Sequence, residues 1–121
     1  MNADKLQAIK ERVEKAIGGP WDLDVYETER NAVFDVWFNE DEYASIHGNA
    51  AIDAFYTADF IAHARQDIPE LVAEIERLRL GLEAVQSQLV YTRGDSPRED
   101  SNITGMCIRI RQLLNGEEVD W

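Results

Sequence analysis

Residues 60–89, with the sequence FIAHARQDIPELVAEIERLRLGLEAVQSQL, contain the pattern that decides the fold of this chain. Hydrophobic residues recur there at alternating intervals of four and three, as they do along the seam of a coiled coil. The six seam residues are Leu71, Ile75, Leu78, Leu82, Val85 and Leu89. Another helix, from this chain or from a second copy, has to cover an apolar stripe that is so narrow and so long. The chain has no other helical pattern of equal length. We therefore predict that the seam is the interface of a homodimer or of a higher even-numbered oligomer.

A second helical pattern precedes the seam. Its main hydrophobic residues are Ile52, Tyr56, Phe60 and Ala64, which follow one another at intervals of four. This spacing places them on one face of a helix that runs from about residue 50 to residue 65. The helical period therefore returns in this segment.

The residues between these two patterns predict a corner. Asp67 can cap the start of a new helix, and Glu70 is placed to complete a capping box. Pro69 is tolerated in the first turn of such a helix, because the N–H group that proline lacks has no partner there. We therefore expect a central pair of helices that meet at residues 66–69, the second of which is long and resembles a coiled-coil helix.

The first 50 residues predict one helix followed by three strands. The helix has one apolar face and ends at the Gly-Gly-Pro sequence of residues 18–20. Short β-prone segments then follow at residues 21–26, 32–38 and 43–47, separated by polar turns. In the first segment hydrophobic residues alternate with Asp22 and Asp24, which predicts a strand with one solvated face. These segments predict a small antiparallel meander, which needs a helix on its apolar face for stability.

The expected fold class is α+β. It consists of the small antiparallel β-meander, an N-terminal helix, the central helix pair and a C-terminal helix at residues 103–114. A chain of 121 residues is long enough for one modest core, so we expect a single domain over residues 1–121. The strand at residues 32–38 has hydrophobic residues on both faces, among them Phe34 and Trp37. One face should be covered by a helix and the other by a second subunit.

The charge of the chain limits its partners. The net charge is −12, and residues 21–64 carry ten acidic side chains against one arginine. Such a negative field repels nucleic-acid polymers and anionic membrane surfaces. The sequence has no apolar run long enough to span a bilayer and no secretion signal, and its lone Cys107 fits a reducing compartment. We therefore expect a cytoplasmic protein that binds neither nucleic acid nor membrane.

Two blocks of the sequence resemble a family of small proteins common in bacteriophages and prophages. The blocks are LQAIKERVEKAIGGPW at residues 6–21 and DFIAHARQDIPELVAEIERLR at residues 59–79. Members of this family mostly carry no assigned activity. The resemblance implies a phage-type accessory protein that acts in the cytoplasm of an infected bacterial host, where small acidic helical proteins often counter host defences.

Arginines gather in the last third of the chain. Guanidinium groups, the free amides at a helix start and a polar loop are what a phosphate site requires, and an aromatic side chain beside them can stack on a nucleobase. The candidate ligand-binding residues are Tyr91, Arg93, Arg98, Asn102, Thr104, Arg109 and Arg111. The alternative is that these arginines only form ion pairs with neighbouring acidic side chains on a solvated surface.

Other reactive groups give weaker patterns. Glu70 and Glu74 have a spacing that could hold Mg²⁺ on one helical face, but no second acid pair is spaced to face them. His47 and His63 each lack a second ligand at zinc-binding spacing, and Cys107 has no nearby histidine to activate it. We therefore predict no catalytic residues, no metal and no cofactor.

These observations favour a non-enzymatic phage anti-defence protein. It would bind and sequester a small anionic nucleotide-type immune signal, such as a cyclic nucleotide or a cyclic ADP-ribose derivative, at the late arginines. The first alternative is an acidic DNA mimic that binds and inhibits a host defence protein through residues 21–64. The second alternative is a Mg²⁺-dependent helical nucleotide pyrophosphohydrolase.

Overall fold

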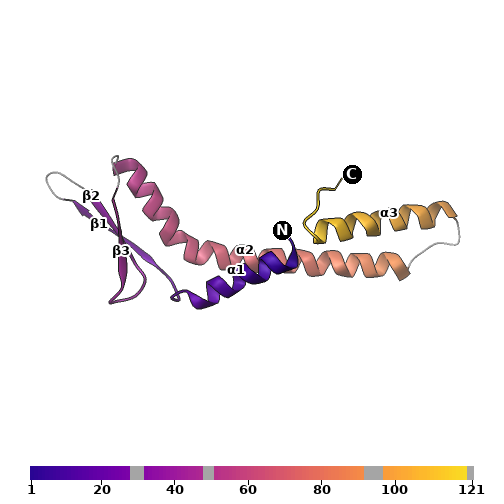
Figure 1. Cartoon of the computed structure of the whole chain (residues 1–121), viewed down its shortest axis with the longest axis horizontal. Coiled ribbons are helices and arrows are strands. Elements are labelled where there is room, and N and C mark those ends of the chain that lie inside the picture. Colours follow the sequence, from indigo (N-terminus) through magenta and orange to yellow (C-terminus); the bar gives the residue numbers. More distant parts are fainter. Residues whose placement is uncertain (28–31, 48–50, 92–96, 120–121) are drawn as a thin grey trace. The chain divides into compact units, whose positions relative to one another are not determined.

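A computed structural model describes residues 1–27, 32–47, 51–91 and 97–119; the side chains of residues 51, 91 and 97–101 lie outside this description. These described residues form three helices and a three-stranded sheet, whose arrangement can be followed in Figure 1. In chain order the elements are α1 (Ala3–Lys15), β1 (Asp22–Glu27), β2 (Ala32–Trp37), β3 (Tyr43–Ile46), α2 (Ala51–Tyr91) and α3 (Pro97–Leu114). The α+β prediction is confirmed, and the three strands fall where their hydrophobic patterns placed them.

The chain forms two compact units. The sheet unit comprises Lys10–Leu71, and the helical unit comprises Met1–Ile9 together with Val72–Trp121. Helices α1 and α2 each contribute residues to both units, so the division does not follow the sequence and leaves the prediction of a single domain open.

The sheet is antiparallel with the strand order β1-β2-β3. Because successive side chains of a strand point to opposite faces, the register sorts the residues into two faces. Leu23, Val36 and Ala44 are paired across the strands on the inner face. Asp22, Trp37 and Tyr43 form the corresponding row on the outer face. The strands therefore alternate between an apolar face and a face rich in aspartate and aromatic residues.

The first half of α2 packs on the inner face of the sheet through alanines (Figure 1). Ala54, Ala58 and Ala62 recur every four residues and are buried with Phe34 and Val36 in one cluster. Small side chains allow the helix backbone to approach the strands closely, and Ala58 and Val36 are both completely buried. Ile52, Tyr56 and Phe60, whose period predicted this helix, lie on its other side, because the alanine face is the buried one.

The predicted corner at residues 66–69 is also wrong. Helix α2 continues without interruption from Ala51 to Tyr91 and contains Pro69. A proline inside a helix removes one backbone hydrogen bond and costs about 3 kcal/mol. The strong helix-forming sequence on either side and the tertiary contacts of both halves offset this cost. One such contact is made by the Arg65 guanidinium, whose Nη1 donates to the carbonyl oxygen of Val13 at 2.9 Å.

The continuity of α2 changes the expected effect of replacing Asp67. An exposed aspartate in a helix interior is a poorer helix former than alanine, so Asp67→Ala should stabilise the protein by about 0.5 kcal/mol. At a helix N-cap the same change would instead cost about 1 kcal/mol. Urea denaturation of the wild type and the variant shows whether the free energy of unfolding rises or falls. A loss of about 1 kcal/mol would restore the two-helix interpretation.

In the helical unit, α3 lies beside the second half of α2 (Figure 1). Gln86 Nε2 donates to the carbonyl oxygen of Cys107 at 3.3 Å, and Arg111 Nη2 donates to Gln86 Oε1 at 2.8 Å. The apolar residues Leu6, Val72, Ile110 and Leu114 are buried in this unit.

Helix α3 ends at Leu114, as predicted, but it begins at Pro97 and not at residue 103. Gly116 has a φ of 77°, and its N–H bonds to the carbonyl oxygen of Leu113. The N–H of Glu117 bonds to the carbonyl oxygen of Gln112, which completes a Schellman cap. A side chain at Gly116 would meet the backbone of Met1 at 2.8 Å, so glycine is required there by space as well as by conformation.

No helix in the described part of the chain is long and apolar enough to cross a membrane.

Candidate functional site

Three of the seven predicted ligand-binding residues cannot be placed. Arg93 lies outside the described residues. Tyr91 is the last residue of α2 and Arg98 is in the first turn of α3, but their side chains lie outside the description. The proposed contact of an aromatic side chain with a nucleobase therefore stays a prediction.

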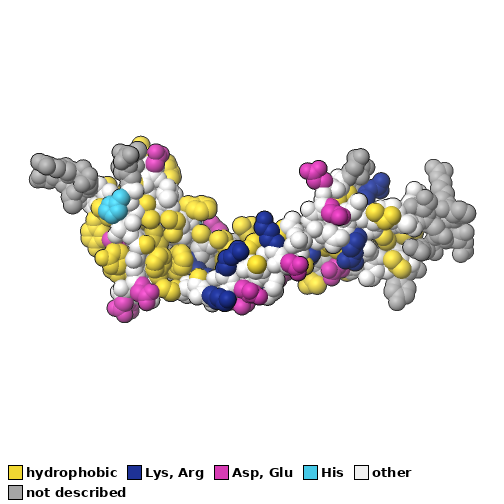
Figure 2. Space-filling model, in the orientation of Figure 1, with side chains coloured by type: hydrophobic (Ala, Val, Ile, Leu, Met, Phe, Trp, Pro, Cys, Tyr) yellow, Lys and Arg dark blue, Asp and Glu magenta, His cyan; other side chains and the backbone are white. Residues whose placement is uncertain are grey.

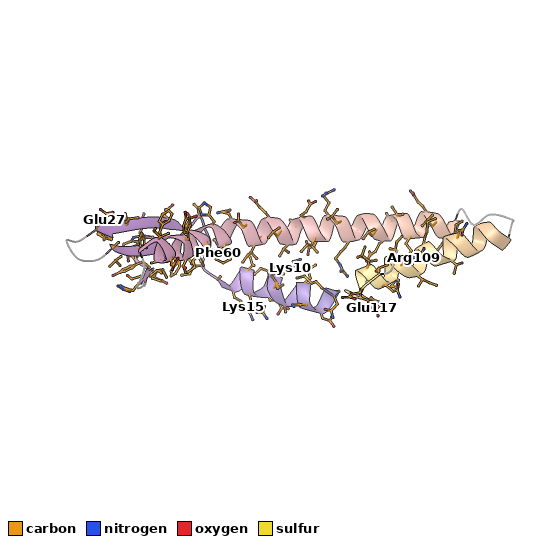
Figure 3. All side chains as sticks on the ribbon, turned by 90° about the horizontal axis from the view of Figure 1, so that it is seen from above. Lys10, Lys15, Glu27, Phe60, Arg109 and Glu117 are labelled. Atoms are coloured by element: carbon orange, nitrogen blue, oxygen red, sulfur yellow. The ribbon has the colours of Figure 1, made fainter. Side chains whose placement is uncertain are left out.

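The other four residues lie on α3 and fall into two pairs. Residues seven apart share a helical face, which places Asn102 with Arg109 and Thr104 with Arg111 on nearly opposite sides of the helix. Arg111 binds the side chain of Gln86 on α2, so it fastens the two helices together. Arg109, labelled in Figure 3, has its guanidinium Nη1 3.8 Å from the position that a Cβ on Gly105 would take. The helix therefore does not bring these four residues into one site.

The other reactive groups also have structural roles. Arg77 Nε donates to Glu74 Oε2 at 2.9 Å, and this bond lowers the pKa of the Glu74 carboxyl. Glu74 is thus half of an ion pair within its own helix. The half-buried Cys107 has its Sγ 4.0 Å from the carbonyl oxygen of Gln86. Among the described residues, no three His, Cys, Asp or Glu side chains are grouped as metal ligands.

The outer face of the sheet gathers carboxylates beside aromatic rings. Asp24 and Asp35 are direct partners across β1 and β2, and Ser45 is the partner of Asp35 on β3. The next row on the same face pairs Trp37 with Tyr43, whose ring centroids are 4.5 Å apart. Directly opposed like charges destabilise a sheet. The sheet therefore holds an unfavourable carboxylate pair next to a pair of aromatic rings.

Asp35 is the most buried member of this face. It is only 6% exposed and accepts a hydrogen bond of 2.5 Å from the hydroxyl of Ser45. Asp24, by contrast, is exposed and uses Oδ1 to accept the N–H of Val25 at 3.0 Å.

An open groove of about 430 Å³ lies at the edge of the sheet where β1 begins and β2 ends. Its walls include the carboxylates of Asp22, Asp24 and Glu40 and the rings of Trp37 and Phe38. The turn that carries Glu40 is held in place by Asn39, whose Oδ1 accepts the N–H groups of residues 41 and 42 at 2.9 and 2.7 Å. The groove thus combines negative charge with aromatic surface on a supported turn.

The outward face of α2 in the sheet unit is apolar. Ile52 is 70% exposed, Tyr56 is 64% exposed and Phe60 is 74% exposed, and the three residues lie on the side opposite to the buried alanines. Figure 2 shows hydrophobic side chains gathered over the sheet and this half of the helix, and Figure 3 labels Phe60. We call the row of Ile52, Tyr56 and Phe60 the α2 row.

Acidic side chains surround the α2 row. Asp53, Asp59 and Asp67 lie on or beside the same helical face, together with His63. The pKa of the His63 imidazole is raised above its ordinary value, first by the hydrogen bond of 2.8 Å to the carbonyl oxygen of Asp59 and then by the charge of Asp59. The α2 row is therefore an apolar surface with a negative border.

The six seam residues of α2 divide into two sets with different burial. Ile75, Leu82 and Leu89 are half-buried within the chain. Leu71, Leu78 and Val85, which are spaced by seven, remain 60%, 52% and 47% exposed. Gly81 beside them has open space around the position of a Cβ, so it marks no close helix approach within this chain. The chain covers one side of the predicted seam and leaves the other side open.

Comparison of the sequence and fold with protein-family models, curated proteins and solved structures gave no match. The phage-family membership suggested by residues 6–21 and 59–79 therefore stays a prediction.

Sequence reasoning missed the exposure of the α2 row, whereas it assigned the outer sheet face to a second subunit or, in the DNA-mimic alternative, to a host protein. The three residues of the row were identified only as part of the hydrophobic period of a helix, because large hydrophobic residues outrank alanine on any hydrophobicity scale. A second pattern in the same segment indicates the buried face. Its alanines, Ala54, Ala58 and Ala62, also follow one another at intervals of four. The alternation of Asp22 and Asp24 with hydrophobic residues did predict a solvated face on β1.

Proposed function

We propose that this chain is a non-enzymatic protein-binding inhibitor whose sheet unit engages a basic protein partner. The observation that carries the proposal is the α2 row, three large hydrophobic side chains that are each more than 60% exposed. Exposed apolar surface with a polar border is typical of protein–protein contact sites. Aromatic residues such as Tyr56 and Phe60 supply much of the binding energy at such sites.

The charge of the sheet unit selects the kind of partner. Residues 10–71 carry fourteen acidic side chains against five basic ones. Complementary charge speeds association and excludes partners of like charge. A basic protein surface with apolar side chains of its own fits both properties of the unit. Together with the resemblance to phage accessory proteins, this supports an inhibitor of a host defence protein.

Sequestration of an anionic nucleotide is the second candidate. It is supported by the shared helical face of Asn102 and Arg109 on α3, which could present one guanidinium and one amide to a phosphate. Arg111 would have to leave Gln86 before it could take part. Protein binding requires no such rearrangement, so we place it first.

Self-association is a separate part of the proposal. The exposed residues Leu71, Leu78 and Val85 could pack against the same residues of a second copy, as in a two-fold helix pair. Leu78 and Val85 belong to the helical unit, and Leu71 is the last residue of the sheet unit. The helical unit suits contact with a second copy better than the sheet unit does, because it carries ten acidic side chains against seven basic ones. Two copies would then present two sheet units to partners in a bacterial cytoplasm.

Calorimetry with three classes of ligand distinguishes the candidate functions. The ligands are a short peptide of alternating leucine and arginine, a panel of cyclic nucleotides with cyclic ADP-ribose isomers, and Mg²⁺ with a nucleoside triphosphate. A protein-binding inhibitor should bind the peptide with a dissociation constant below about 100 μM and bind it more weakly as salt increases. A nucleotide that binds while the peptide does not would favour sequestration. A hydrolysed nucleotide would show an enzyme.

A further inference from the structure

We propose that the groove where β1 begins and β2 ends is a site for an arginine side chain of the partner polypeptide. This inference rests on the proposed function and deepens it, because it assigns one contact of the partner to one place in the sheet unit. The groove of about 430 Å³ is large enough for a side chain with its neighbouring backbone.

The walls of the groove match the chemistry of a guanidinium group. Trp37 offers an aromatic face, on which a cation is attracted by the negative charge of the ring. Asp22 is the cross-strand partner of Trp37, so its carboxylate starts from the same row of the same sheet face. Glu40 lines the groove from the β2–β3 turn. A guanidinium that stacks on the indole could therefore donate hydrogen bonds to carboxylates at its edge.

Beside the groove, the sheet pairs two acidic side chains with each other. Asp24 lines the groove, and its direct partner across the strands is the buried Asp35. A cation bound beside these residues would convert a repulsive carboxylate pair into an attractive arrangement of charges. The hydroxyl of Ser45 already occupies one oxygen of Asp35. The exposed Asp24 uses Oδ1 to accept the N–H of Val25 at 3.0 Å.

The same charges decide which occupant fits. We expected a second subunit to cover the outer sheet face, but a second copy would bring Asp22, Asp24 and Asp35 against an equally acidic face. An anionic ligand meets the same repulsion. A side chain from a basic polypeptide has the opposite charge, and the α2 row of the same unit gives the rest of the polypeptide an apolar surface to contact.

Nuclear magnetic resonance of the indole N–H groups tests this assignment. The probes are the leucine–arginine peptide, the same peptide with citrulline in place of arginine, and spermidine at equal charge. Citrulline keeps the shape of arginine and removes its charge. The signal of Trp37, identified with a Trp37→Phe variant, should move with the arginine peptide and stay in place with the other two. Equal movement with citrulline or with spermidine would overturn the assignment.

Calorimetry of matched variants completes the test. Asp22→Asn and Asp24→Asn remove charge from the groove with little change in shape, and each should weaken binding of the arginine peptide by about tenfold. The control Glu83→Gln removes one charge from the helical unit and should have little effect. Undiminished binding by both groove variants would overturn the cation site. If Tyr56→Ser still weakens binding in that case, the proposed function stands and only the groove assignment fails.

Discussion

Replacing Leu78 and Val85 together with glutamate is expected to convert a self-associated form of the protein into a monomer. Both side chains are about half exposed in the single chain, so their replacement should leave its own packing intact. In a helix pair, each copy would bury two new charges in the seam. An unpaired charge in such an interface costs several kcal/mol, which lowers the affinity of association by more than about a hundredfold.

Sedimentation velocity at micromolar concentration measures this effect. A matched control is the pair Leu80→Glu and Ser87→Glu, which adds the same charge at the same spacing of seven on the opposite side of α2. The control should sediment like the wild type. Leu82 is less suitable as a target because it is half-buried within the chain, and its replacement would disturb the fold as well. If the wild-type protein sediments as a monomer, the proposed self-association is wrong.

The second large effect is expected at Ala58. This residue is completely buried where α2 meets the inner face of the sheet. A leucine there has no space and would push the helix away from Phe34 and Val36, so Ala58→Leu should destabilise the protein by about 1–3 kcal/mol. The adjacent exposed Thr57 provides the control, since Thr57→Leu should change stability by less than about 0.5 kcal/mol.

Urea denaturation of both variants gives the comparison. Equal stability of Ala58→Leu and the wild type would mean that the alanine face of α2 does not pack on the sheet. It would also remove the argument that Ile52, Tyr56 and Phe60 face outward, because the two faces lie on opposite sides of one helix.

Much of the fold follows from local patterns in the sequence. The alternation of Leu23 and Val25 with aspartates predicts a strand with one solvated face, and the cap at Gly116 ends α3 as expected. These features are set by neighbours in the chain. The corner at Pro69 was predicted on the same kind of local evidence and is wrong, because the energy of tertiary packing along α2 exceeds the local cost of one proline.

The choice between the two faces of α2 could not be made from hydrophobicity. Burial depends on shape as well as on transfer free energy, and alanines let a helix lie closer to a sheet than phenylalanine or tyrosine would. The sequence also could not show that Asp24 and Asp35 are direct partners, since the register joins residues eleven positions apart. For the predicted phosphate site, helical geometry on α3 already separates Arg109 from Arg111.

The central claim is that the α2 row binds a basic protein partner, and calorimetry of one double variant tests it most directly. Tyr56→Ser combined with Phe60→Ser removes two aromatic side chains that are 64% and 74% exposed, so the fold should be unchanged. The control is Leu80→Ser with Val90→Ser, which removes two exposed apolar side chains from the helical unit. Burial of a large apolar side chain contributes about 1.5–3 kcal/mol. We predict that the Tyr56→Ser, Phe60→Ser variant binds the leucine–arginine peptide at least about tenfold more weakly than the wild type and the control. Equal affinity of all three proteins would contradict it.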